Sequence, residues 1–258
     1  MSIEVTILGC ASSSGVPAVG NNWGKCNPEN PKNRRLRSSI LVKSNKTSIL
    51  IDATPDLRQQ LLNADVQKLD GVLITHTHAD HINGIDDFRF LNVIMKKSIE
   101  LYANKKCMAE IENRFGYVLK ELVPEAKGFF YKPHLKPNII NSDFNIKDLN
   151  ITPFQQDHGY SESTGFRINN MAYSSDVVNL SEEAFSKLNN LDLWIVDCLR
   201  YKPHQTHSHL EKTLQWIKRV KPKRSVLTHM NFEVDYDDIQ ALLPNNCEPA
   251  FDGMVIKC

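Results

Sequence analysis

The sequence has no long hydrophobic run, no paired cysteines and almost no net charge. No apolar stretch approaches the roughly 20 residues of a membrane-spanning helix. Residues 1–4 do not begin a basic region followed by a long apolar stretch, the pattern expected of a secretory leader. The net charge of +1 argues against a long nucleic-acid footprint. We therefore expect a cytoplasmic protein that has no membrane partner and acts on small molecules.

The cysteines also exclude two common kinds of site. They are scattered and form no Cys-x-x-Cys pair: Cys10, Cys26, Cys107, Cys198, Cys247 and Cys258. This spacing argues against a disulfide framework and against a zinc ion held by cysteines.

Length and composition indicate an ordinary globular protein. The chain has 258 residues, of which 41% are hydrophobic and 24% are charged. These values are close to the average for globular proteins and far from those of disordered chains. No linker interrupts the pattern, so the prediction is a single domain over residues 1–258.

Short apolar runs and periodic patterns predict a mixture of strands and helices. Strands are expected at residues 4–8, 39–43, 47–51, 71–74, 99–103, 149–154, 166–168, 171–174, 191–196 and 225–227. Helices are expected after Ser181 and at residues 55–63, 85–95, 105–122, 210–220 and 235–242. Ser208 is a candidate N-cap for the helix at 210–220.

A histidine-rich segment follows the strand expected at residues 71–74. It reads Thr75-His76-Thr77-His78-Ala79-Asp80-His81. On extended chain His76 and His78 project to the same side, and the turn into the next helix can bring Asp80 and His81 to the same point. Imidazole and carboxylate groups suit zinc, and also manganese or iron. The segment therefore predicts a metal site; the alternative is a solvated polar loop.

Other predicted strands also end in groups that can bind metal. His158, Asp176 and His229 each follow a strand, which raises the set of candidate ligands to His76, His78, Asp80, His81, His158, Asp176 and His229. One zinc ion needs three or four ligands, whereas two metals that share a carboxylate use all seven. Asp52 also ends a strand; it either orients a ligand histidine by accepting its second N–H or caps the helix that follows.

The order of these groups resembles that of the metallo-β-lactamase superfamily: His-x-His-x-Asp-His, then His, then Asp, then His, each after a strand. The resemblance implies an α/β fold, a four-layer αββα sandwich with a dinuclear site along one edge of its two sheets. It implies two divalent ions, zinc or manganese, with iron also suited. The implied ligands are His76, His78 and His158 for one metal, Asp80, His81 and His229 for the other, and Asp176 as the bridge.

Four further segments resemble one branch of this superfamily, the cyclic phosphodiesterases of the carbon–phosphorus lyase pathway. They are Gly15-Val16-Pro17, Arg34-Arg35, Leu227-Thr228-His229 and Phe251-Asp252-Gly253-Met254. That branch carries an additional structural zinc held by three cysteines and a histidine. Only Cys26 matches those positions here, so we predict that this chain lacks the extra site.

The resemblance implies a dinuclear-metal-dependent hydrolase, most closely a phosphodiesterase for a small cyclic phosphate or a nucleotide-like phosphodiester. A hydroxide shared by the two metals would be the nucleophile, and Asp80 is among the groups on which catalysis would depend. The leaving alkoxide needs a proton, and the resemblance places the general acid at His207. His209 is the alternative donor or an orienting partner; without such roles, both would be surface histidines before a helix.

Three other functions fit the same ligands. A thioesterase of the glyoxalase II type usually adds a C-terminal helical region, which is not evident here. A tRNA-processing-like endonuclease would need a long arm between His158 and Asp176, where the sequence leaves room only for a short hairpin. The third is a non-catalytic, metal-dependent binder of phosphorylated ligands.

Two further features leave alternatives open. The basic segment at residues 20–37, with Arg34, Arg35 and Arg37, is either a solvated loop or the source of an arginine fork for phosphate. A homodimer is the expected assembly, because dimers are common among soluble proteins.

Overall fold

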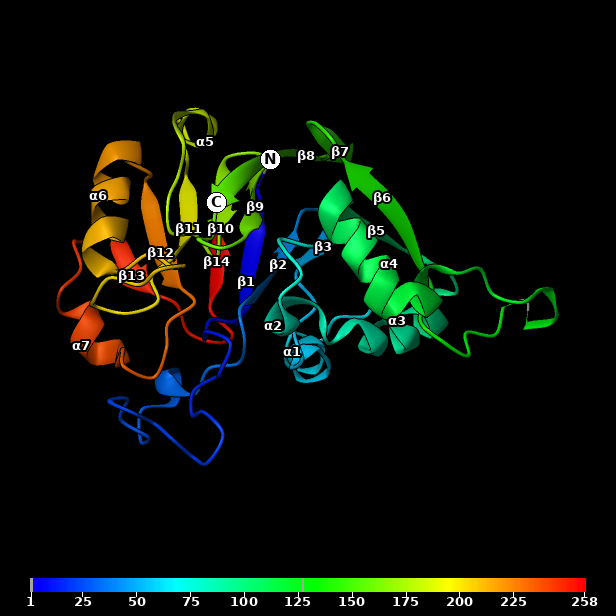
Figure 1. The fold of residues 1–258 in the computed structure, drawn as a ribbon, viewed down its shortest axis with the longest axis horizontal. Coiled ribbons are helices and arrows are strands. Elements are labelled where there is room, and N and C mark those ends of the chain that lie inside the picture. Colours follow the sequence, from blue (N-terminus) through cyan, green and yellow to red (C-terminus); the bar gives the residue numbers. More distant parts are fainter. Residues whose placement is uncertain (1, 127) are drawn as a thin grey trace.

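The computed structural model describes residues 2–126 and 128–258. Its described strands form two sheets of seven, which pack face to face (Figure 1). The first sheet has the spatial order β14 (Val255–Lys257), β1 (Glu4–Gly9), β2 (Ser39–Lys43), β3 (Ser48–Ile51), β4 (Gly71–Leu73), β5 (Ile99–Asn104), β6 (Leu135–Ile140). The second has the order β13 (Cys247–Pro249), β12 (Arg224–Thr228), β11 (Leu193–Asp197), β10 (Met171–Ser174), β9 (Glu162–Ile168), β8 (Leu149–Asp157), β7 (Phe144–Ile146).

Alternating side chains fill two separate hydrophobic cores. In β2, Ile40 and Val42 point into the core between the two sheets, whereas Leu41 points into a core beneath the helices. From the second sheet, Phe166 and Trp194 are fully buried in the core between the sheets. Strands buried on both faces need apolar residues at successive positions, which explains the short continuous apolar runs of the sequence.

Helices cover the outer face of each sheet (Figure 1). The first sheet is covered by α1 (Leu57–Asn63), α3 (Phe88–Met95) and α4 (Lys105–Leu119). The second is covered by α5 (Glu182–Lys187), α6 (Leu210–Val220) and α7 (Tyr236–Gln240). The short helical turns are α2 (Ala79–Ile82), η1 (Pro31–Asn33), η2 (Ile85–Asp87) and η3 (Pro124–Ala126). These layers confirm the predicted α/β, αββα architecture.

The hairpin formed by β8 and β9 is longer than its apolar residues indicate. The prediction ended the first strand at residue 154 and began the second at 166, because the residues between them are polar. Gln156 and Ser163 are nevertheless buried, and the Gln156 amide donates hydrogen bonds to Ser163 Oγ at 2.9 Å and to the Ser175 carbonyl at 3.0 Å. These bonds satisfy the amide N–H groups of Gln156, and the extended hairpin delivers its turn to the end of the sheets.

Other boundaries differ from the predicted ones for local reasons. The prediction missed β6, β7, β13 and β14. Of these, β6 is an edge strand that contains Pro137, a residue that edge strands tolerate. The helix expected at 55–63 begins at Leu57, and the one expected at 105–122 ends at Leu119. The N-cap prediction for Ser208 is wrong: His209 occupies that position, while Ser208 Oγ donates to the Asp197 carbonyl at 2.7 Å.

The two chain ends lie side by side, since Ile3 and Cys258 exchange backbone hydrogen bonds of 2.7 and 2.9 Å.

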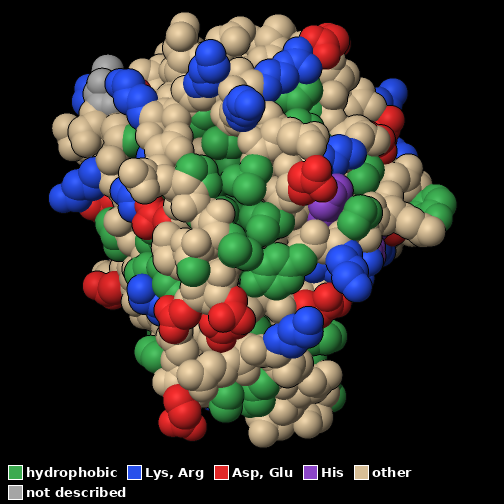
Figure 2. Space-filling view, turned by 90° about the vertical axis from the view of Figure 1, so that its left-hand side faces the viewer, with side chains coloured by type: hydrophobic (Ala, Val, Ile, Leu, Met, Phe, Trp, Pro, Cys, Tyr) green, Lys and Arg blue, Asp and Glu red, His purple; other side chains and the backbone are tan. Residues whose placement is uncertain are grey.

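Figure 2 shows the face that carries α6 and α7, where hydrophobic side chains gather near the middle and charged side chains surround them. No described helix is both long and apolar enough to cross a membrane.

Candidate metal centre

The first sheet contributes four of the seven predicted ligands. His76 and His78 lie in the turn between β4 and α2, and Asp80 and His81 lie within α2. Because β4 is parallel to β3 and β5, this turn leaves the sheet at the carboxyl ends of three adjacent strands. The turn was expected to bring all four groups to one point; instead His76 and His78 lie in one group of candidate ligands, and Asp80 and His81 lie in another.

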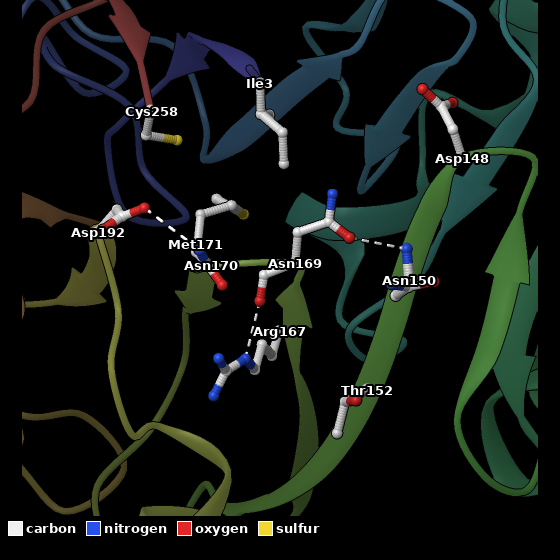
Figure 3. A pocket seen from close by; sticks show the side chains of 10 residues that line it. All are labelled: Ile3, Asp148, Asn150, Thr152, Arg167, Asn169, Asn170, Met171, Asp192 and Cys258. Carbon is white, nitrogen blue, oxygen red and sulfur yellow. Dashed lines mark hydrogen bonds between the residues drawn. The ribbon is translucent and has the colours of Figure 1, made fainter. Parts of the chain in front are cut away.

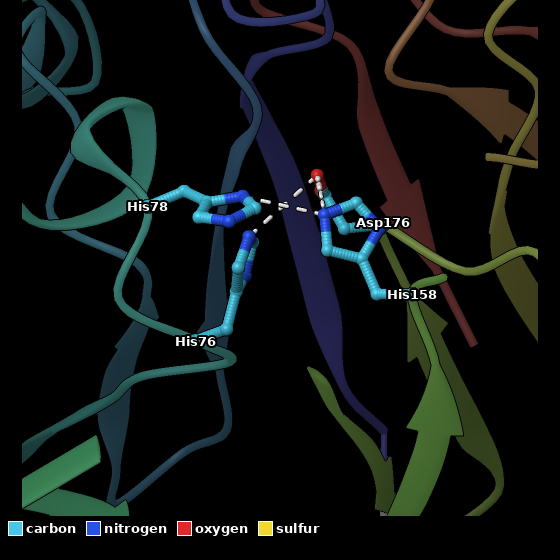
Figure 4. A group of neighbouring side chains, drawn as sticks. All are labelled: His76, His78, His158 and Asp176. Carbon is cyan, nitrogen blue, oxygen red and sulfur yellow. Dashed lines mark hydrogen bonds and ion pairs between the residues drawn. The ribbon is translucent and has the colours of Figure 1, made fainter. Parts of the chain in front are cut away.

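The second sheet contributes the other three. His158 lies in the turn that joins β8 to β9, and Asp176 and His229 closely follow β10 and β12. Strands β10, β11 and β12 are parallel to one another, so their carboxyl ends meet at the same edge of the sheet. Figure 4 shows His76 and His78 on one side and His158 and Asp176 on the other, with their polar atoms turned toward one another.

The seven residues form two groups, within each of which the ligand atoms lie within 4.8 Å of one another. One group is His76, His78, His158 and Asp176, and the other is Asp80, His81, Asp176 and His229. Asp176 belongs to both.

The two carboxylate oxygens of Asp176 face different groups. Oδ1 lies 3.7 Å from His76 Nε2 and 3.7 Å from His158 Nε2. Oδ2 lies 3.1 Å from His81 Nε2 and 3.4 Å from His229 Nδ1. A carboxylate that turns one oxygen to each of two ligand groups has the arrangement expected of a bridge between two cations.

Hydrogen bonds set the tautomers of four histidines so that each turns a lone pair toward the centre. His81 Nδ1 donates to Asp52 Oδ2 at 2.7 Å, and His158 Nδ1 donates to the Thr206 carbonyl at 2.7 Å. In the neutral form of each ring Nδ1 carries the proton, so Nε2 is the nitrogen with the free lone pair.

The same holds for the other two histidines. His76 Nδ1 lies 3.0 Å from Thr75 Oγ1, whose own proton goes to Asp52. His229 Nδ1 lies 3.1 Å from Ser38 Oγ, whose proton goes to the Ala11 carbonyl. Each hydroxyl can therefore only accept from the imidazole, which again leaves Nε2 unprotonated.

The centre fits two divalent cations. Nε2 of His76 and Nε2 of His81 are buried without a hydrogen-bond partner among the described residues. Burial lowers the pKa of His76 well below its usual value, which keeps this imidazole neutral and able to bind metal. Around His81 the carboxylates of Asp176, Asp80 and Asp52 outweigh burial and raise its pKa well above the usual value. Three acids around one buried ring are an excess of negative charge that cations would balance.

Asp52 has the orienting role predicted for it. Its carboxylate accepts from His81 and also from the backbone N–H and the hydroxyl of Thr75, both at 2.8 Å. The alternative role as a helix cap is wrong, because Asp56 occupies the N-cap position of α1.

Three acidic or histidine residues at strand ends have a left-handed backbone. Their φ angles are 66° for Asp52, 55° for Asp176 and 61° for His229. This region is uncommon for residues other than glycine, although Asp, Asn and His adopt it more readily than most. The sharp turn at each strand end aims the side chain into the centre.

His207 lies in the same cavity as the ligands but belongs to neither group. Its Nδ1 lies 3.0 Å from Asp197 Oδ2, and its Nε2 lies 3.9 Å from Asp176 Oδ1. Although burial opposes it, Asp197 raises the pKa of His207 to about 9. His209 is not among the residues that line this cavity. The prediction gave Asp197 no role, although its place at the end of β11, between two ligand-bearing strands, was a usable signal.

The cavity at the centre has a volume of about 270 Å³. A larger hollow of about 600 Å³ lies elsewhere and is lined by none of the candidate ligands (Figure 3). There the Arg167 guanidinium donates to the carbonyls of Asn169, Lys187 and Asn189. Because these structural bonds occupy its charged group, we do not assign the chemistry to that hollow.

The arginines of the basic segment do not line the metal cavity. Arg35 is 1% exposed, and its Nη2 donates to Asn33 Oδ1 at 2.9 Å and to the Val234 carbonyl at 2.8 Å. Arg34 lies over the Trp23 ring, and Arg37 pairs with Asp56 at 2.8 Å. Arg35 is thus a buried structural residue, which neither the arginine fork nor the solvated loop predicts.

Several solved structures resemble the whole chain. A diphosphatase from the PhnP family is 30% identical, with a TM-score of 0.90 over 100% of this chain and 98% of that one. Zinc-bound PqqB from Methylobacterium extorquens is 18% identical, with a TM-score of 0.73 over 98% and 99%. The latter similarity concerns the fold alone.

Among curated proteins, an octanoyltransferase from Porphyromonas gingivalis is 30% identical over 251 residues, which are 96% of this chain and 50% of that protein. The chain thus spans half of the length of this relative. A profile of the β-lactamase superfamily domain matches residues 47–230, a stretch that contains every candidate ligand. The match, the fold and the two ligand groups agree, and the chain belongs to the metallo-β-lactamase superfamily.

Proposed function

We propose that this metal-dependent hydrolase is a phosphodiesterase, acting on a small cyclic phosphate or a nucleotide-like phosphodiester. The observation that carries the proposal is the position of Asp176, which turns one oxygen to each ligand group beside a histidine suited to donate a proton. The similarity to a PhnP-family diphosphatase over the whole chain supports chemistry at a phosphorus–oxygen bond.

The seven ligands define what the centre would hold. His76, His78 and His158 would bind one divalent ion and Asp80, His81 and His229 the other, with Asp176 shared; zinc, manganese and iron all suit these donors. Two bound cations lower the pKa of water and neutralise the charge that builds on a phosphoryl group.

His207 is the proposed general acid. Asp197 holds its Nδ1, so the proton on Nε2 faces the cavity and can pass to the leaving oxygen. The pKa of about 9 means that the ring carries this proton at neutral pH.

The proposal is tested with bis(4-nitrophenyl) phosphate, a 2′,3′-cyclic nucleotide and a dinucleoside diphosphate. We expect the metal-loaded protein to hydrolyse the diesters, and Asp80→Ala to abolish this activity by removing a ligand. Asp143→Ala, an exposed acid outside the cavity, is the matched control. Turnover of the diphosphate alone would show that the substrate is a phosphoanhydride and not a phosphodiester. Binding without turnover of any compound would favour the binding-only alternative.

A thioesterase is the second candidate. It is favoured by the 30% identity with the octanoyltransferase of Porphyromonas gingivalis, although this chain spans half of that protein. Octanoyl-coenzyme A is the direct test: release of its thiol by wild type but not by Asp80→Ala would support the thioesterase and contradict the phosphodiesterase.

An endonuclease with a long RNA-binding arm has less support. Between His158 and Asp176 the chain forms only the end of the β8–β9 turn, β9, the Asn169-Asn170 turn and β10. These elements pair within the sheet and leave no inserted arm in this stretch.

A further inference from the structure

The segment that carries four of the candidate ligands, residues 76–81, lies partly at the surface of the molecule. His78 and Ala79 are exposed, and Thr77 and Asp80 are half-buried. Packing alone holds the backbone of such a stretch weakly, because few of its atoms are buried. Hydrogen bonds from neighbouring elements therefore matter more here than in the strands.

Arg114 of α4 binds the start of this segment from outside. Its Nη1 donates to the Thr77 carbonyl at 2.7 Å. In the part of the chain that the structure describes, no other hydrogen bond joins the backbone of residues 76–80 to a residue outside 75–83. The bond from Arg114 is thus what attaches this stretch of backbone to a second element.

The same guanidinium also binds the end of the segment. Arg114 Nη2 donates at 2.8 Å to Oδ1 of Asn83, the residue at the C-cap of α2. Because a guanidinium is planar and rigid, its two bonds fix the separation of their acceptors. His78, Asp80 and His81 lie between those acceptors in the sequence.

Helix α4 is a firm support for these bonds. Ile111 and Val118 are fully buried in the core beneath the helices of the first sheet. Tyr117 makes a further contact from the same helix, since its hydroxyl donates at 2.6 Å to Asp86, in the η2 turn that follows α2. A packed helix therefore holds an exposed segment through two of its side chains.

The positive charge of Arg114 does not favour the binding of cations, because like charges repel. If Arg114 acted on the metal centre through its charge alone, its removal would tighten metal binding. If it acts by holding the segment, its removal would weaken metal binding. The two roles thus predict changes of opposite sign.

We propose that Arg114 is a positioning residue for the metal centre, whose bonds to Thr77 and Asn83 hold the ligand segment in its metal-binding conformation before a cation arrives. The segment then loses its conformational entropy on folding and not on metal binding, which raises the affinity for metal. The inference goes beyond the proposed function and holds whichever bond the protein hydrolyses.

Zinc affinity tests the proposal, measured by competition with a chromophoric chelator. We expect the apparent Kd for zinc to rise about tenfold in Arg114→Ala, the lower end of the range for groups that orient metal ligands. Arg114→Lys should not restore the affinity, because an ammonium group lacks the planar geometry that fits both acceptors. Unchanged or tighter binding by Arg114→Ala would overturn the proposal.

The control variant removes an arginine that holds a loop without ligands. Arg89 of α3 donates to the Phe130 carbonyl at 2.9 Å. We expect Arg89→Ala to change the apparent Kd for zinc less than twofold. A loss of affinity equal to that of Arg114→Ala would contradict a specific role of Arg114.

Hydrogen exchange on the metal-free protein separates positioning from a general loss of stability. We expect the amides of residues 77–83 to exchange faster in Arg114→Ala than in wild type, and those of β4 and β10 to exchange at the same rate. Unchanged exchange at 77–83, or faster exchange throughout the protein, would contradict the proposal.

Neither measurement needs a substrate, so failure of the phosphodiesterase proposal would leave both results valid. A wild type that binds no zinc would contradict the metal centre itself and this role of Arg114 with it.

Discussion

The imidazole of His207 has two nitrogens with different tasks. Asp197 accepts from Nδ1 at 3.0 Å, so the Nε2 proton is the one that can reach a leaving group. The benefit of that proton depends on the leaving oxygen, because a poor leaving group needs it far more than a good one.

We predict that His207→Ala lowers kcat about 100-fold for an alkyl phosphodiester and much less for bis(4-nitrophenyl) phosphate, whose phenolate leaves without a proton. Metal content, measured by plasma mass spectrometry, should stay the same because His207 belongs to neither ligand group. Equal losses on both substrates would contradict the acid role, and a matching effect of His209→Ala would assign the role to His209.

Asp252 is a half-buried acid that is not part of the metal centre. Its Oδ2 accepts from the Leu36 N–H at 2.6 Å, and its Oδ1 faces Cys10 Sγ at 3.4 Å. Burial, which these hydrogen bonds and Arg35 only partly offset, raises the pKa of Asp252 to about 7. A pKa higher in the folded than in the unfolded state means that folding takes up a proton, so stability falls as pH rises from about 4 to about 7 and then levels off.

We predict that this acid contributes a slope of up to about 1 kcal/mol per pH unit to the free energy of unfolding between pH 5 and 7. Urea denaturation across this range, on wild type and on Asp252→Asn, isolates the contribution because the histidines are common to both proteins. The two stability curves should converge toward low pH; parallel curves would show that Asp252 titrates normally.

At the residue scale, the sequence was informative wherever a polar group directly followed an apolar run. His76 and His229 could be found in this way, as could Asp52. Ser38 and Thr206, which fix the tautomers of two histidines, could not be found, because they contact their partners through loops distant in the sequence.

At the element scale, the loop that contains η1 is held by a buried polar cluster. Asn33 is fully buried; its amide donates to Asp235 Oδ2 at 2.6 Å, and its Oδ1 accepts from Arg35 and from the Tyr236 N–H. The Cys26 thiol donates to the Val234 carbonyl at 3.2 Å. These bonds join the loop to the segment that follows His229.

We predict that Asn33→Ala lowers the free energy of unfolding by about 2–4 kcal/mol, because the buried donors and acceptors of its three partners lose their hydrogen bonds to Asn33. Asn30→Ala, at the N-cap of η1, should cost about 1 kcal/mol. Urea denaturation measures both, and equal effects would show that the cluster does not hold the loop.

Strands were predictable where both faces are apolar and not where polar side chains enter the core. The run around Leu41 indicates a strand by composition alone. Gln156 and Ser163 give no such signal, because their burial depends on hydrogen bonds to a neighbouring strand. The edge strand with Pro137 was missed for a different reason, since its exposed positions resemble a loop.

At the scale of the whole molecule, the metal centre joins the two halves of the sandwich, since each sheet supplies ligands to both groups. We predict about two divalent ions per chain, about one after Asp80→Ala, and fewer than one after Asp176→Ala, which removes the shared ligand. Plasma mass spectrometry on protein purified without added metal measures this. Chelation should lower the melting temperature of wild type, and equal metal content in the two variants would contradict a shared Asp176.

The four-layer architecture was predictable because the ligands recur after strands in a fixed order. The packing of the layers was not, because it follows from which face of each strand a residue occupies. Ile40 and Leu41 are adjacent and equally apolar, yet they belong to different cores. Only the register of the strand separates them.

The left-handed backbone at Asp176 and His229 restricts how this centre could be redesigned or could drift in evolution. Aspartate, asparagine, histidine and glycine tolerate such a φ, whereas glutamate, the other carboxylate, would add about 1–2 kcal/mol of strain. A change of ligand that keeps the same donor atom is therefore not neutral at these positions. The turns, as well as the metals, limit the choice of ligands. A different metal preference would require a change of backbone conformation at these turns before another side chain could serve as a ligand.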